Sequence, residues 1–247
     1  MFVIFKIIII SFWILFLLPF QITFIIIKSS ARYNLPRIFH KGLLIILGVK
    51  VNIKGSILKK RPLILLGNHC SYLDIIVLSS LTSVCFVAKE EIKSWFFFGF
   101  LAKLQNTIFI SRRNFSSANS IHKINKKLNR SFAIILFPEA TTSKGKTILK
   151  FKSSLYGIFE KNSIIKLQNF SLCYTHINGM PLDNRLRPKI AWYGDMDLLS
   201  HLKRLLNISS INASVTFHPS LNILGLDRKE ICYESREQVL NGFHSSF

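Results

Sequence analysis

Residues 63–74 read Leu-Ile-Leu-Leu-Gly-Asn-His-Cys-Ser-Tyr-Leu-Asp, an apolar run followed at once by polar side chains. A short continuous apolar run that ends at a glycine is typical of a β-strand buried on both faces of its sheet. Comparable runs recur along the chain, over residues 84–88, 107–110, 133–137, 164–174, 189–193 and 213–217. The stretch therefore predicts one strand of a larger sheet, with polar residues at its carboxyl end.

The segments between these runs have helical spacing. Residues 118–128 place apolar side chains at three- and four-residue steps, and residues 151–161 and 195–206 are similar. Strands that alternate with helices predict an α/β fold: a single domain over residues 36–247, with a mainly parallel central sheet flanked by helices. Residues 36–55 mix basic and apolar side chains, which favours an interfacial linker leading into the first strand.

The amino-terminal segment is built differently. Residues 7–27 carry no charge, and as a helix they would extend about 31 Å, roughly the thickness of a bilayer's hydrocarbon core. Only Lys6 precedes this run, whereas four cations follow it, at Lys28, Arg32, Arg37 and Lys41. We expect residues 1–35 to be a transmembrane or membrane-inserted anchor, with the catalytic domain on the cytoplasmic side. The anchor could be a full transmembrane span or a hairpin that enters one leaflet. A signal peptide is disfavoured, because the run is longer than a signal peptide's apolar core.

Composition narrows the class of protein. Apolar residues make up 49% of the 247, and 33 Lys and Arg against 12 Asp and Glu give a net charge of +21. This much apolar content excludes a disordered chain. Four cysteines are too few for a disulfide scaffold. A polytopic transporter would need several long apolar runs, and the sequence has one. The excess positive charge predicts a negative partner, such as an anionic membrane, a phosphate-bearing substrate or nucleic acid.

The polar residues after the first strand can carry chemistry. His69 and Asp74 are five residues apart, and both side chains can meet where the chain turns into a helix. A carboxylate that accepts the Nδ1–H of an imidazole fixes the tautomer and leaves Nε2 free to act as a base. Such a dyad would take a proton from a substrate hydroxyl without a nucleophilic serine. His-x4-Asp alone is a weak pattern that also occurs by chance.

Polar residues end two further runs. Residues 107–113 close with Arg112 and Arg113, and Phe137-Pro138-Glu139-Ala140-Thr141-Thr142-Ser143 closes the next. Parallel strands bring their carboxyl ends to one edge of a sheet, so His69, Arg112 and Glu139 could line one cleft. Arg112 could then bind a phosphate group with two parallel hydrogen bonds.

The three blocks N-H-x-S-x-x-D, I-F-I-x-R and F-P-E-x-T-x-S, in this order, resemble the glycerolipid acyltransferase family over about residues 40–220. The resemblance implies transfer of a fatty acyl group from acyl-CoA or acyl-carrier protein to the hydroxyl of a lysolipid. His69 would be the general base and Asp74 would orient it. Arg112 would hold the acceptor's phosphate with Lys89 nearby, and Thr141 and Lys152 would bind the acceptor. Glu139 would hold its glycerol hydroxyls or stabilise the loop.

The resemblance further implies lysophosphatidic acid as acceptor, phosphatidic acid as product, the bacterial inner membrane as location, and neither a metal, a bound cofactor nor nucleic acid. The chain departs from the family at Ala140, where a glycine is usual, at Thr142, where many members have arginine, and at 167–170, which lacks a proline. These departures leave open another acceptor, such as lyso-ornithine lipid. A rival of another class is a non-enzymatic basic membrane protein, in which His69 would be dispensable.

Overall fold

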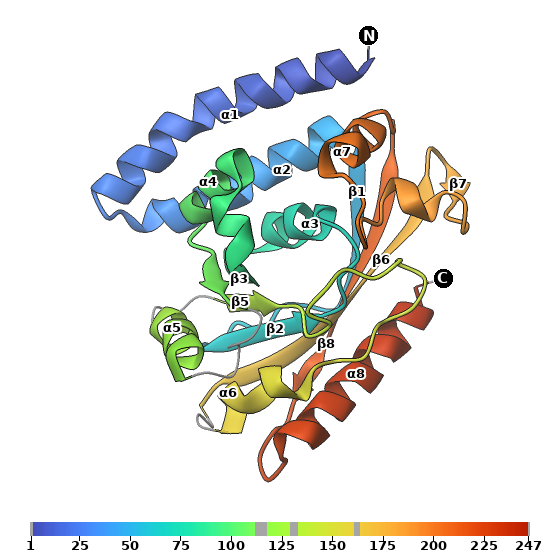
Figure 1. Cartoon of the computed structure of the whole chain (residues 1–247). Helices are drawn as coiled ribbons and strands as arrows, with labels where there is room; N and C mark the ends of the chain where they lie inside the picture. The colour runs from blue at the N-terminus through green and yellow to red at the C-terminus, as the bar shows by residue number, and fades with distance from the viewer. Residues whose placement is uncertain (1, 112–117, 129–132, 161–163, 247) are drawn as a thin grey trace.

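An eight-stranded sheet forms the centre of the computed structural model, which describes residues 2–111, 118–128, 133–160 and 164–246. Seven strands follow the order β1-β8-β6-β2-β5-β3-β4, and β7 pairs with β6 alone (Figure 1). The strands are β1 (Val49–Lys54), β2 (Leu63–Gly67), β3 (Val84–Lys89), β4 (Ile108–Ile110), β5 (Ala133–Leu136), β6 (Lys166–Ile177), β7 (Met180–Pro181) and β8 (Ile211–Leu221).

Strands β6, β2, β5, β3 and β4 are parallel to one another, and β8 runs antiparallel to β6. Strand β2 lies in the middle of the sheet, and its residues alternate between two cores. Leu63 and Leu65 belong to one apolar cluster, and Ile64 and Leu66 belong to the other. The continuous apolar run at 63–66 is therefore explained by a strand covered on both faces, and the predicted fold class is confirmed.

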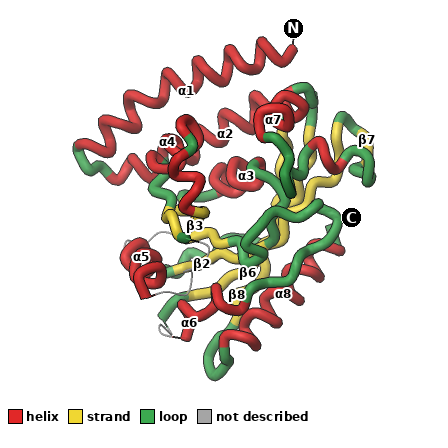
Figure 2. Tube along the Cα trace, viewed as in Figure 1, coloured by secondary structure: helices red, strands yellow, loops and turns green. Residues whose placement is uncertain are grey.

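Helices form a layer on each side of the sheet (Figures 1 and 2). One layer contains α2 (Leu35–Leu47), α3 (Leu73–Leu81), α4 (Phe96–Leu104) and α7 (Leu198–Leu206), and the other contains α5 (Ala118–Leu128), α6 (Gly157–Glu160) and α8 (Arg228–His244). Short 3-10 helices are η1 (Ser30–Tyr33), η2 (Glu90–Ser94), η4 (Ser153–Tyr156) and η5 (Arg187–Lys189). Because both layers cover β2, the Asn68–Asp74 motif begins where a fully buried strand ends.

Helix α1 (Phe2–Ile26) lies along the outside of α2 (Figure 1). It is long and apolar enough to cross a membrane, and most of its apolar side chains face outward. Polar contacts tie it to the domain at both ends. Lys6 Nζ donates to the Ile208 carbonyl at 2.7 Å, and Gln21 Nε2 donates to the carbonyls of Arg32 and Leu104 at 3.0 and 2.8 Å.

Three expected elements differ from the structure. The linker expected over 36–55 contains helix α2, which starts with Pro36 in its first turn and ends at Gly48 in the left-handed conformation (φ 73°), before β1. The strand expected over 189–193 is a turn after η5, and its apolar residues are buried because they pack against the sheet's core. The helix expected over 151–161 is shorter, formed by η4 and α6.

Candidate active site

The turn between β2 and α3 carries the first sequence block. Asn68 anchors this turn to the neighbouring strand, because its side chain donates to the Leu172 carbonyl at 2.7 Å and accepts from the Leu172 amide at 2.8 Å. Asn68 is buried, so both halves of its amide find the partners that burial demands. His69 therefore follows a position that is fixed to the centre of the sheet.

The His69 ring and the Asp74 carboxylate are in contact. Nδ1 of His69 lies 2.7 Å from Oδ2 of Asp74, whose side chain is fully buried. The imidazole stacks on Phe137 at a centroid distance of 3.9 Å, and its side chain remains 17% exposed. Across the described residues Nε2 of His69 has no hydrogen-bond partner. This geometry holds the ring with Nδ1 protonated and leaves the Nε2 lone pair available to accept a proton.

Asp74 is held by further donors besides the ring. Its Oδ2 accepts from the backbone amides of Cys70 and Ser71 at 2.8 and 3.0 Å. Its Oδ1 accepts from the Tyr174 hydroxyl at 2.7 Å. Burial, with Asp74 adding to it, raises the pKa of Tyr174 well above its usual value, so the hydroxyl stays a donor at neutral pH. The sequence analysis missed Tyr174, which lies within buried strand β6, 100 residues from Asp74.

A second buried carboxylate contacts the same motif. Oε1 of Glu139 accepts from the backbone N–H of His69 at 2.7 Å, and Oε2 accepts from the backbone N–H of Leu149 at 2.9 Å. Burial raises the pKa of Glu139 to about 7, although these two backbone hydrogen bonds lower it. Both oxygens thus face protein backbone, which favours the loop-stabilising role over a direct contact with glycerol hydroxyls.

The turn after Glu139 has the conformation that the family's usual glycine would suit. Ala140 adopts a positive φ of 55°, which costs a residue with a Cβ about 1 kcal/mol relative to glycine. The backbone N–H of Ser143 then donates to the His69 carbonyl at 2.8 Å. His69 is therefore bound through its amide, its carbonyl and its ring, by the loop after β5 and by Asp74.

Comparison with known proteins identifies the family of this chain. The acyltransferase family profile matches residues 48–167. The lyso-ornithine lipid O-acyltransferase of Rhizobium meliloti is 36% identical over 225 residues, which is 88% of this chain and 77% of that protein. This chain belongs to the lysolipid acyltransferase family.

Two other matches are less similar in sequence. The 1-acyl-sn-glycerol-3-phosphate acyltransferase of Neisseria gonorrhoeae is 32% identical over 158 residues, covering 61% of this chain and 57% of that protein. The crystal structure of the LPA acyltransferase PlsC from Thermotoga maritima superposes with a TM-score of 0.68 at 19% identity, over 97% of this chain and 95% of that one. This likeness shows that the fold is shared, with the sheet and its helices in the same arrangement.

The remaining residues that the family resemblance selects lie around the sheet edge. Lys89 ends β3 and is half-buried, Thr141 is exposed in the turn after Glu139, and Lys152 is exposed just before η4. Arg112 lies outside the described residues. No group of three or more His, Cys, Asp and Glu side chains that could hold a metal occurs in the described part of this acyltransferase.

A buried histidine supports the far side of the motif. His201 of α7 is fully buried, with Nδ1 at 2.9 Å from the Tyr72 hydroxyl and Nε2 at 3.1 Å from the Ala191 carbonyl. Since the carbonyl can only accept, Nε2 carries the proton and Nδ1 accepts from Tyr72. The Trp192 amide also donates to the Cys70 carbonyl at 2.8 Å. The segment expected to be a strand is instead a turn that closes over the motif.

Proposed function

We propose that this enzyme transfers a fatty acyl group from a thioester donor to the hydroxyl of a lysolipid, with His69 as general base. The observation that carries the proposal is the 2.7 Å contact between His69 Nδ1 and Asp74 Oδ2, with Nε2 unpartnered among the described residues. Family membership supplies the reaction class, acyl transfer. This family membership argues against the alternative of a non-enzymatic basic membrane protein.

The dyad accounts for each proton in the reaction. Nε2 of His69 accepts the proton of the lysolipid hydroxyl as its oxygen attacks the thioester carbonyl carbon. The tetrahedral intermediate collapses, its C–S bond breaks, and the thiolate leaves with the bond's electron pair. The imidazolium then returns the proton to the thiolate, which gives an ester and a free thiol. Asp74 stabilises the imidazolium while it exists and keeps its own charge throughout.

We propose lyso-ornithine lipid as the acceptor, ahead of lysophosphatidic acid. The lyso-ornithine lipid O-acyltransferase of Rhizobium meliloti matches 88% of this chain, whereas the LPA acyltransferase of Neisseria gonorrhoeae matches 61% of it. The third sequence block agrees, because Thr142 stands where many family members have arginine. A missing guanidinium weakens binding of a phosphate headgroup more than binding of an amino-acid headgroup. Lysophosphatidic acid stays the second candidate because the PlsC fold is shared.

We further propose that the enzyme acts on the cytoplasmic face of a bacterial inner membrane, with α1 inserted. Helix α1 presents apolar side chains outward, and the neighbouring Phe96 of α4 is 97% exposed. The Gln21–Leu104 contact links these two helices. Because α1 is tied to the domain at both ends, this arrangement favours insertion along one leaflet over a full span. The net charge of +21 favours a membrane with anionic lipids.

The experiment that tests the function is an acceptor panel with purified, detergent-solubilised enzyme. Labelled palmitoyl-CoA or palmitoyl-carrier protein is offered with lyso-ornithine lipid, lysophosphatidic acid or a neutral lysolipid. We expect kcat/KM for lyso-ornithine lipid to exceed that for lysophosphatidic acid by about tenfold or more. The reverse order would replace the proposed acceptor with lysophosphatidic acid. Transfer to none of them above the level of a no-enzyme control would contradict the proposed function.

A further inference from the structure

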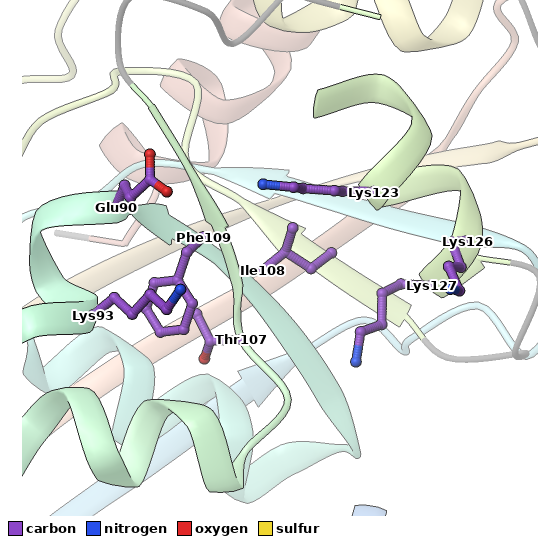
Figure 3. A pocket seen from close by; sticks show the side chains of 8 residues that line it. All are labelled: Glu90, Lys93, Thr107, Ile108, Phe109, Lys123, Lys126 and Lys127. Carbon is purple, nitrogen blue, oxygen red and sulfur yellow. The ribbon is translucent and has the colours of Figure 1, made fainter. Parts of the chain in front are cut away.

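A groove of about 380 Å³ lies beside β4 (Figure 3), and His69 does not line it. Strand β4 is at the edge of the sheet and pairs only with β3, so its outer edge is open among the described strands. The two walls are η2 and α5, and the floor is β4 with the residue before it. The lining residues are Glu90, Lys93, Thr107, Ile108, Phe109, Lys123, Lys126 and Lys127.

The groove is strongly cationic for its size. Four lysines line it against a single carboxylate, that of Glu90. Three of the lysines share one turn of α5, a helix whose sequence contains no acidic residue, and the fourth comes from the opposite wall. Lys127 Nζ is held near the start of β4 by the Asn106 side chain at 3.3 Å. Lys93 and Lys123 extend toward β4 from the two sides (Figure 3), and cations on two sides of a groove suit a ligand with more than one negative charge, such as a phosphate ester.

The floor of the groove is apolar as well. Ile108 and Phe109 contribute side chains from the two faces of β4, with Phe109 beside Lys93 and Ile108 near Lys123 (Figure 3). A volume of a few hundred Å³, with apolar walls and a few charged groups, is typical of a site for a small organic ligand. The groove therefore fits a phosphate attached to an organic chain better than it fits an inorganic ion.

The position of the groove relates it to the dyad. Helix η2 follows the carboxyl end of β3, and His69 follows the carboxyl end of β2, so both lie toward the same edge of parallel strands. The order β2-β5-β3-β4 separates the two strands by three spacings, or about 14 Å. An extended pantetheine arm has the length of about four residues, again about 14 Å. An extended arm that starts at His69 therefore spans the lateral distance between β2 and β4, the strand that the groove adjoins.

We propose that the groove beside β4 binds the phosphate end of a phosphopantetheine thioester, the acyl donor, whose acyl carbon then lies at His69. The proposal rests on the proposed function, since it concerns the donor of that reaction. Acyl-CoA and acyl-carrier protein both carry this phosphate, and they differ only in what is attached beyond it. The lysines act by binding and take no part in the proton transfers at His69.

Charge reversal in the groove tests the proposal. The variant Lys123→Glu/Lys126→Glu is compared with the control Lys59→Glu/Lys60→Glu, which reverses two exposed lysines in the loop before β2. Each is assayed with palmitoyl-CoA, with palmitoyl-carrier protein and with palmitoyl-pantetheine, which lacks the phosphate. We expect KM for one or both phosphorylated donors to rise about tenfold in the groove variant, with kcat within about twofold. KM for palmitoyl-pantetheine should stay at its wild-type value, and the control variant should match wild type.

The three donors separate the outcomes. A rise for palmitoyl-CoA alone identifies the nucleotide-bearing donor, and a rise for the carrier protein alone identifies the protein donor; either result supports the proposal. An unchanged KM for both overturns it, and so does an equal rise for palmitoyl-pantetheine. Binding of coenzyme A and of phosphopantetheine to the His69→Ala protein, measured by calorimetry, needs no turnover. Binding weakened about tenfold by the groove substitutions would support the groove even if the proposed acceptor proved wrong.

Discussion

Two buried carboxylates, Asp74 and Glu139, contact the same histidine in different ways. Asp74 accepts a hydrogen bond from the imidazole ring, and it also binds two backbone amides and a tyrosine hydroxyl. Within the described residues Glu139 accepts only from backbone N–H groups, those of His69 and Leu149. Both are buried and both are close to His69. The role of each carboxylate therefore follows from its hydrogen-bond partner. Asp74 contacts the ring of His69 and influences proton transfer, whereas Glu139 contacts backbone N–H groups and stabilises the loop.

The largest difference in kcat between the two sites should appear when each carboxylate is replaced by the amide of the same size. Asp74→Asn replaces an acceptor facing Nδ1 with an amide that can favour the wrong tautomer, and kcat should fall about 10³- to 10⁴-fold. Steady-state assays with the acceptor panel measure it. A loss for Asp74→Asn no greater than the loss for Glu139→Gln would break the comparison.

Glu139→Gln should have a smaller effect on rate. The amide can accept from only one of the two N–H groups, so the other loses its partner, and kcat should fall about tenfold as the His69 backbone shifts. The matched readout is circular dichroism of folded protein, which should stay close to wild type. A loss as large as that of Asp74→Asn would give Glu139 a direct role in the chemistry.

The raised pKa of Glu139 also predicts a pH dependence of stability. Because its pKa is about 7 in the folded protein against 4.5 in the unfolded chain, the unfolded state releases this proton first as pH rises. The contribution of Glu139 to stability is full below about pH 4.5 and is lost as pH rises to about 7. Denaturant titrations should show this decline in wild type and a flatter profile in Glu139→Gln. Equal slopes would contradict it.

Tyr174→Phe sharpens the comparison by removing one donor from Asp74 while the ring contact stays. The hydroxyl contributes one hydrogen bond among several, so kcat should fall about fivefold or less. A structural role alone would leave the pH–rate profile unchanged, whereas a positioning role should change that profile. Wild-type rate together with a wild-type pH profile would remove Tyr174 from the site.

The smallest effect is expected at Ala140. Glycine relieves the positive φ, which favours folding by up to about 1 kcal/mol, partly offset by the greater freedom of glycine in the unfolded chain. Ala140→Gly should raise the Tm slightly and leave kcat within about twofold. A lowered Tm would show that the turn prefers alanine despite its backbone conformation.

Patterns within short stretches of sequence predicted the structural features that depend on neighbouring residues. The strand at 63–66 and the spacing of His69 and Asp74 could be predicted, because a buried strand and the turn after it are encoded within twelve residues. The helix over 35–47 was missed because its basic residues and the apolar run before it resemble an interfacial linker. The segment over 189–193 was predicted as a strand because a turn that buries Ile190 and Ala191 needs the same apolar residues as a buried strand.

Contacts between distant segments could not be predicted from these patterns. Tyr174 lies within a buried strand, where one more aromatic residue gives no sign of a polar role, and only the pairing of β2 with β6 brings it near Asp74. Glu139 was found through its motif, but its two backbone partners depend on a loop that returns at Leu149. The groove beside β4 could not be predicted, because it depends on the packing of η2 against β4.

The most direct test of the central claim is the rate of acyl transfer by His69→Ala beside wild type, with the same donor and lyso-ornithine lipid. If Nε2 of His69 takes the hydroxyl proton, the variant should lose at least about 10³-fold in kcat while keeping its wild-type circular dichroism and melting curve. A folded His69→Ala protein that retained near wild-type turnover would contradict the account.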